Sequence, residues 1–158
     1  MRLAGQCRCA RLTSNVRPHG LILGESNEMN SALEFHDSEV SSITDADGSL
    51  HVRFSAAYVH RSDGVPGVDS GEGYIQAVEL TLENASWDGS LAECIGKLSD
   101  GELFVVDRPL GLVPLPFEST SQTRVELQFS NGATLLARGA PVHVRTNGAA
   151  RFVERFVC

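Results

Sequence analysis

Apolar and polar residues alternate with a period of two along most of the chain after Met29. The alternation is clearest in residues 50–54, 78–82, 125–129 and 142–145, where one set of alternate positions is apolar and the other is polar. Successive side chains of a β-strand point to opposite faces of a sheet. The pattern therefore predicts strands with one face on a core and the other in water.

Dipeptides that favour tight turns separate these segments. Asn131-Gly132 and Asn147-Gly148 each lie between two alternating runs, so we expect hairpins with type I′ turns there. Asp47-Gly48 and Asp100-Gly101 indicate two more turns, followed by predicted strands at 50–58 and 102–106. Short strands joined in this way are typical of an all-β fold. We predict a single antiparallel β-sandwich or flattened barrel.

The first 28 residues differ from the rest and show no sustained period. They hold four arginines and two glutamates, a net charge of +2, whereas the remainder holds 9 basic and 18 acidic residues, a net charge of −9. Gly24-Glu25 is encoded by GGN-GAR, which can spell a ribosome-binding sequence just upstream of Met29. We therefore expect residues 1–28 to be a disordered leader or the product of a misplaced start, and residues 29–158 to form the domain. A transit peptide is a weaker alternative.

Composition and charge narrow the class of protein. The length of 158 residues and the hydrophobic content of 42% fit one compact domain. A formal net charge of −7 disfavours nucleic acid and anionic membranes as partners. Cys7 and Cys9 form a lone pair in the leader, and nothing resembles a disulfide framework, so we expect a cytoplasmic protein.

His36 and Asp37 form the first candidate site, because a histidine beside an aspartate suggests a metal ligand or a general base. Adjacent strand residues face opposite ways, so the two side chains meet only at a β-bulge. Val40 and Ile43, three residues apart, break the period and indicate such a bulge. The alternative is that Asp37 and Ser38 hydrogen-bond local backbone there.

His60, Arg61 and Asp63 form the second candidate site. If the alternation persists, His60 lies on the same face as Phe54 and Tyr58, buried or at the rim of the core.

A long loop rich in glycine and acidic residues follows the second candidate site. Asp63, Asp69 and Glu72 offer hard oxygen ligands to calcium, although the EF-hand spacing is absent. The alternative is a mobile loop with a type II turn at Pro66-Gly67. No cofactor-binding motif is evident, so no cofactor is expected. Serine, cysteine and histidine residues are present, but no spacing pairs them as a nucleophile and its base.

Several segments resemble a small uncharacterised bacterial all-β family. They are residues 33–43, 50–64 and 73–85, the later PLPFE at 114–118, and VELQFSNGATLLARG at 125–139. The similarity spans Leu33 to Phe156, and it implies an all-β fold and a bacterial origin but no activity. The His-Asp-Ser at residues 36–38 is also similar to the openings of some bacterial immunity-type proteins.

Three functional hypotheses follow. The first is a small acidic, non-enzymatic binding module that binds a protein partner, or a second copy of itself, through an exposed sheet edge. The second is an enzyme or a metal- or ligand-binding protein whose site joins the candidate residues His36, Asp37, His60, Arg61 and Asp63. The third is an immunity-type neutraliser of a basic toxin, suggested by the acidic balance and the His-Asp-Ser likeness.

Overall fold

A computed structural model describes residues 10–12 and 29–157, and this part of the chain is all-β, with antiparallel pairing throughout and no helix. The strands are β1 (Ala10–Leu12), β2 (Asn30–Ala46), β3 (Ser49–Ser62), β4 (Gly71–Leu82), β5 (Ser86–Asp88), β6 (Gly96–Val105), β7 (Arg108–Pro109), β8 (Val113–Leu115), β9 (Phe117–Ser119), β10 (Thr123–Phe129), β11 (Thr134–Gly139), β12 (Val142–Thr146) and β13 (Arg151–Val157). The predicted fold class is confirmed. The path of paired strands, β1-β13-β4-β3-β2-β6-β10-β11-β5, does not close into a barrel.

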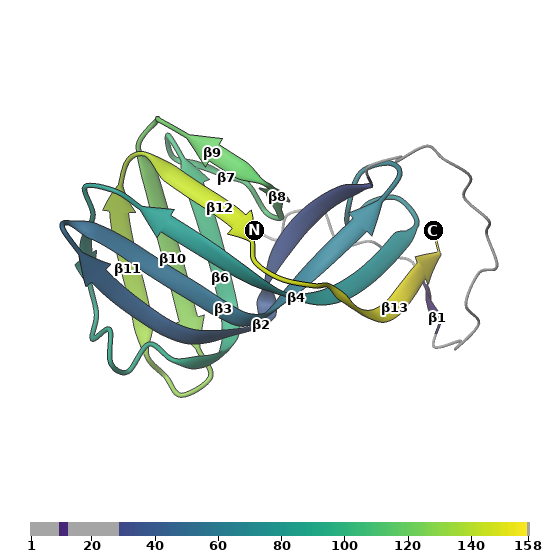
Figure 1. Cartoon of the computed structure of the whole chain (residues 1–158), viewed down its shortest axis with the longest axis horizontal. Helices are drawn as coiled ribbons and strands as arrows, with labels where there is room; N and C mark the ends of the chain where they lie inside the picture. Colours follow the sequence, from purple (N-terminus) through teal and green to yellow (C-terminus); the bar gives the residue numbers. More distant parts are fainter. Residues whose placement is uncertain (1–9, 13–28, 158) are drawn as a thin grey trace.

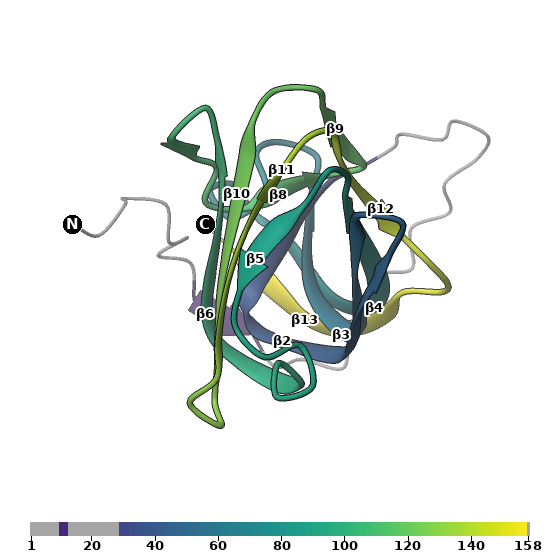
Figure 2. The same ribbon diagram turned by 90° about the vertical axis from the view of Figure 1, so that its left-hand side faces the viewer.

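The long strands β2, β3 and β4 run through two lobes of different size (Figure 1). In the larger lobe, β6, β10 and β11 form one layer of a sandwich, and β2, β3, β4 and β12 form the other, as the end-on view shows (Figure 2). The smaller lobe is formed by the other ends of β2, β3 and β4 together with β13, and β1 lies on its outer edge. The three long strands β2, β3 and β4 therefore connect the sandwich of the larger lobe to the smaller lobe.

The core lies between the two layers of the larger lobe and follows the predicted alternation. In β10, the buried positions are Thr123, Val125, Leu127 and Phe129, and the residues between them are half-buried or exposed. Buried aliphatic and aromatic side chains from both layers join one cluster. Burial of these side chains supplies the main favourable free energy of folding.

Two of the predicted hairpins are present. Asp47 and Gly48, with φ of 53° and 80°, join β2 to β3 in a two-residue turn in which Ala46 pairs with Ser49, as expected of type I′. Asn131-Gly132 joins β10 to β11, but only Gly132 has a positive φ (91°), so the expected turn type is wrong there. The loop spans residues 130–133. A loop longer than two residues does not need a positive φ at Asn131.

The other two turn predictions are wrong. Asn147-Gly148 does not close a hairpin, because β12 and β13 both pair with β4, one after the other along the same edge. β4 is long enough to accept both strands, and Asn147 N donates a hydrogen bond to Ala77 O at the junction. Asp100-Gly101 lies inside β6. Glycine is needed at 101 because a Cβ there would lie 2.7 Å from the Cβ of Phe35.

A β-bulge in β3 changes which face His60 occupies. Phe54 pairs with Val78 and Ala57 with Gln76, so three steps along β3 match two steps along β4. The extra residue reverses the alternation. Tyr58 and His60 therefore lie on the face opposite to Phe54, and the expectation that all three share a face is wrong.

The predicted leader lies mostly outside the described residues. Within it, Ala10–Leu12 pair antiparallel with Arg155–Val157 of β13. Cys7 and Cys9 are not among the described residues. Among the described residues, no helix is long and apolar enough to cross a membrane.

Candidate functional site

The structure places His36 and Asp37 at the predicted irregularity in β2. Pairing between β2 and β3 shifts at three points between Glu34 and Ser42, and Asp37 has a φ of 68°. His36 Nδ1 lies 3.2 Å from Asp37 Oδ2, and Lys97 Nζ lies 3.4 Å from Asp37 Oδ1. All three side chains are about half exposed or more.

Ser38, the next residue, explains why the bulge is stable. It is fully buried, its hydroxyl donates to Glu34 O at 2.5 Å, and its oxygen accepts from Tyr58 N at 2.9 Å. The hydroxyl thus satisfies backbone groups that the bulge leaves without a ladder partner. The local hydrogen bonding expected for Ser38 is therefore present.

His60 lies in the smaller lobe, on one face of β3. Its Nε2 atom is 2.7 Å from Glu34 Oε2, and its ring stacks on Phe156 with centroids 5.3 Å apart. Tyr58, on the same face, packs edge-on against His60 and donates to the carboxylate of Glu154. The His60 side chain is only 12% exposed. These contacts tie β13 to β2 and β3.

Arg61 and Asp63 are separated from both of these places. Arg61 follows His60 directly and therefore faces the opposite side of the sheet, where it contacts Tyr74 and Gln76. Asp63 follows the end of β3 and is exposed. The five candidate residues thus occupy several surroundings, and the pair His60–Arg61 is divided between two faces.

The three acidic residues of the expected calcium loop also have separate partners. Asp69 Oδ2 accepts from Val65 N at 2.7 Å and closes the loop on itself. Glu72 contacts Tyr74 and Arg155. Within the described residues, no three His, Cys, Asp or Glu side chains are grouped in a way that could hold a metal ion.

The face of the smaller lobe that Arg61 occupies carries an organised group of aromatic and polar side chains. We call it the aromatic–arginine face, and its members on β3, β4 and β13 are Arg61, Glu72, Tyr74, Gln76, Phe152 and Arg155. The guanidinium carbon of Arg61 lies 4.5 Å from the centroid of the Tyr74 ring. Phe152 meets the same ring edge-on, with centroids 5.7 Å apart, and is 47% exposed.

Polar contacts hold the two ends of this face in place. Arg61 Nη2 donates to Gln76 Oε1 at 3.3 Å, and Gln76 Nε2 donates to Gly148 O at 2.7 Å. At the other end, Tyr74 donates its phenolic hydrogen to Glu72, and Arg155 Nη2 lies 3.5 Å from the same carboxylate. These contacts hold the side chains of Arg61 and Tyr74 in position.

The electrostatics of Tyr74 reflect this arrangement. Partial burial of the phenol, its hydrogen bond to Glu72 and the charge of that carboxylate raise the pKa of Tyr74 to about 12. Arg61 and Arg155 act in the opposite direction but do not outweigh these causes. Tyr74 is therefore neutral at physiological pH and donates its phenolic hydrogen to Glu72.

Exposed apolar side chains gather at the same end of the molecule. The large hydrophobic residues that are about half exposed include Phe152, Val153 and Val157 on β13, and Val65 and Val68 in the loop between β3 and β4. β13 and this loop adjoin, because Phe156 pairs with Gly71 directly after the loop. Exposed apolar residues that cluster in this way mark interaction surfaces more often than single ones do.

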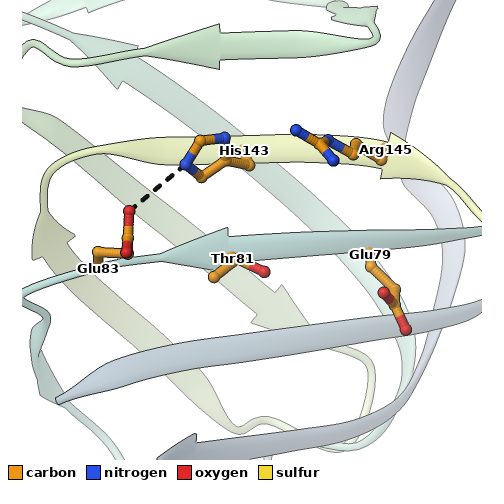
Figure 3. A pocket seen from close by; sticks show the side chains of 5 residues that line it. All are labelled: Glu79, Thr81, Glu83, His143 and Arg145. Carbon is orange, nitrogen blue, oxygen red and sulfur yellow. Dashed lines mark ion pairs between the residues drawn. The ribbon is translucent and has the colours of Figure 1, made fainter. Parts of the chain in front are cut away.

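A second polar surface lies on the outer face of the larger lobe (Figure 3). It is a shallow hollow of about 300 Å³ lined by Glu79, Thr81, Glu83, His143 and Arg145. His51, Thr81, His143 and Glu118 are in register across β3, β4, β12 and β9, and Arg53, Glu79 and Arg145 form the next row.

Most of the charged side chains that line this hollow form ion pairs across neighbouring strands. His143 Nε2 lies 3.4 Å from Glu83, and His143 Nδ1 lies 3.7 Å from Glu118. Arg53 lies 3.4 Å from Glu79. Opposite charges across strands stabilise a sheet by fractions of a kcal/mol, roughly 0.2–1 each. The row of charges thus fits a solvated sheet face and assembles no nucleophile with a base.

Comparison of the chain with protein-family models, with curated proteins and with solved structures gave no match.

Sequence reasoning singled out Arg61 and, as a calcium ligand, Glu72, but it missed the other members of the aromatic–arginine face. Tyr74 and Phe152 are 78 positions apart in the numbering, yet they are directly paired across β4 and β13. The sequence signal that could have identified this face is the alternation of Glu72, Tyr74 and Gln76. In a strand, this spacing places their three polar or amphipathic side chains on the same face.

Proposed function

We propose that this protein is a small, non-enzymatic binding module that recognises a protein partner through the aromatic–arginine face. The observation that carries the proposal is the assembly of Arg61, Tyr74 and Phe152, in which Tyr74 contacts both of the others and Phe152 is half exposed. Tyrosine and arginine are enriched at binding hot spots, because they combine large contact areas with directed hydrogen bonds.

Preorganisation favours binding over a purely structural role for this face. Glu72 and Gln76 hold Tyr74 and Arg61 in position, so little side-chain entropy remains to be lost on binding. Val153 and Val157 are half exposed on the strand that carries Phe152, and Val65 and Val68 lie in the loop that β13 adjoins at Phe156. A mixture of aromatic, apolar and arginine side chains suits a protein surface better than a small charged ligand.

The partner is either another protein or a second copy of the chain. Sedimentation velocity of the full chain across a wide concentration range separates these two cases. For another protein, a photo-reactive phenylalanine analogue is placed at position 152 and, as a matched control, at Ile95, which is 50% exposed elsewhere. The proposal requires either self-association that Phe152→Ser abolishes, or one crosslinked protein specific to position 152. Absence of both results would contradict it.

The other two hypotheses stay predictions. An enzyme or ligand site at His36, Asp37, His60, Arg61 and Asp63 would need side chains that the structure holds in different surroundings to converge on a ligand. Neutralisation of a basic toxin would need a dense acidic surface, and the aromatic–arginine face carries two arginines and one glutamate.

A further inference from the structure

The hairpin between β6 and β7 violates a conformational rule. Val105 pairs with Arg108, so Val106 and Asp107 are the two turn residues, with φ of 49° and 61°. Such turns favour Asn-Gly because both residues need a positive φ. A β-branched residue is an outlier there, and strain of this kind is retained mainly where function requires it.

Burial does not offset this strain. The Val106 side chain is 62% exposed, the largest exposure of any large apolar residue in the described part of the chain. Its backbone N–H donates to Gln122 O at 2.9 Å, a bond that any residue except proline would form. Valine at this position therefore offers nothing to the fold that asparagine would not offer with less strain.

Two arginines face each other beside this hairpin. Arg124 of β10 is directly opposite Arg138 of β11, and like charges at opposed positions destabilise a sheet. Arg124 is supported by Asp107 at 3.1 Å and by Glu126 at 3.2 Å, and its guanidinium lies 4.1 Å from the centroid of Phe104. Arg138 is exposed and has no ion pair within 4.0 Å among the described residues.

A hollow of about 150 Å³ brings these features together. Its lining includes Phe104, Val106, Asp107, Arg124 and Arg138. It therefore combines an aromatic ring under a fixed guanidinium, a protruding apolar side chain and an arginine with no counter-charge. The hairpin belongs to the larger lobe, whereas the aromatic–arginine face belongs to the smaller lobe (Figure 1).

We propose that this hollow is a second docking surface, and that its occupant is an acidic, partly apolar segment of a protein partner. A carboxylate of that segment pairs with Arg138 and relieves its repulsion with Arg124, while an apolar side chain covers Val106. Charge complementarity selects this occupant, because the unbalanced group of the surface is a cation. The inference is independent of the function proposed for the aromatic–arginine face.

The proposal makes a prediction about stability that needs no knowledge of the partner. Val106→Asn removes the strain and Arg138→Thr removes the like-charge pair, so each variant should unfold at a higher temperature than the native chain. For Val106→Asn we expect a rise of about 2–4 °C in Tm. A residue retained for folding would give the opposite sign, so an unchanged or lower Tm for both variants would overturn the proposal.

Binding is tested with a defined probe. The probe is a fluorescein-labelled pentapeptide of alternating leucine and glutamate, and its control has lysine in place of glutamate. We expect fluorescence anisotropy to show binding of the glutamate peptide alone, weakened about five-fold or more by Val106→Asn or by Arg138→Thr. Ile95→Ser, at a half-exposed residue that belongs to neither surface, serves as the matched control and should leave binding unchanged.

Three results would refute the docking surface. They are no binding of the glutamate peptide at about 1 mM, equal binding of the lysine peptide, and equal affinity in the native chain and both variants. Each is independent of the crosslinking outcome at position 152, so failure here leaves the aromatic–arginine proposal standing, and the reverse also holds.

Discussion

Gly73 lies directly beneath the phenol of Tyr58, so a Cβ at position 73 would overlap the Tyr58 hydroxyl and lie 2.8 Å from the carbon that bears it. The absent side chain lets Tyr58 reach Glu154 on β13. We predict that Gly73→Ala lowers the free energy of unfolding by about 1–3 kcal/mol, because overpacking moves the ring or the strand. Urea denaturation followed by circular dichroism measures the change.

A double-mutant cycle tests the cause of this loss. In a Tyr58→Ala background the ring is gone, so Gly73→Ala should cost much less than in the native chain. Equal costs in both backgrounds would show that the effect comes from the backbone at position 73 and has no connection with Tyr58.

The raised pKa of Tyr74 predicts a loss of stability at high pH. The folded value is about 12 against an ordinary value of 10.0. The folded state therefore holds its proton more tightly than the unfolded state between these values. Stability is unaffected below about pH 10 and falls as the pH rises through 12. Chemical denaturation at a series of pH values from 8 to 12 measures this fall.

Replacement of Tyr74 shows how much of the loss of stability at high pH comes from this residue. Tyr74→Phe removes the ionisable group and should flatten the dependence above about pH 10. Phe152→Leu is a suitable control because it changes a neighbour of the ring and leaves the phenol in place. If the native chain and Tyr74→Phe lose stability in parallel, the loss arises from other groups.

Cys94 should be unreactive in the folded protein. Its side chain is 0% exposed, and burial, together with the adjacent Glu93, raises the pKa of the thiol. Both effects reduce the thiolate that reacts with Ellman's reagent. In a Cys7→Ser, Cys9→Ser, Cys158→Ser variant, we expect labelling only at the rate of unfolding. Rapid labelling under native conditions would mean that residues around Cys94 open locally.

The bulge in β3 holds one extra residue, and its removal should leave both faces of the strand in place. Phe54 and Ala57 both belong to the core, and deletion of Ser55 makes them alternate residues of a regular strand. Tyr58 and His60 then keep the opposite face and their contacts with Glu154 and Glu34. We expect a loss of less than about 2 kcal/mol in the free energy of unfolding. The exposed Ser55→Ala change is the control, with an effect within about 0.5 kcal/mol. Loss of the cooperative thermal melt in the deletion variant would contradict this account.

Prediction from sequence succeeded where the information is local. Alternation in β3, β4, β10 and β12 identified the strands and their buried faces, because strand geometry alone fixes a period of two. It failed at Asp100-Gly101, where the glycine serves the packing of Phe35 from another strand. It failed again at Asn147-Gly148, because a dipeptide carries no information on whether the flanking strands pair with each other or with a third.

The candidate sites follow the same division. Local patterns in the sequence were sufficient to predict the antiparallel all-β fold, the bulge near Ser38 and Arg61 as a residue of interest. The opposite faces of His60 and Arg61, the contact of Tyr74 with Phe152 and the opposition of Arg124 and Arg138 emerge only from the folded chain. Alternation constrains each strand separately, whereas register and bulges arise from the packing of strands that are distant in the chain.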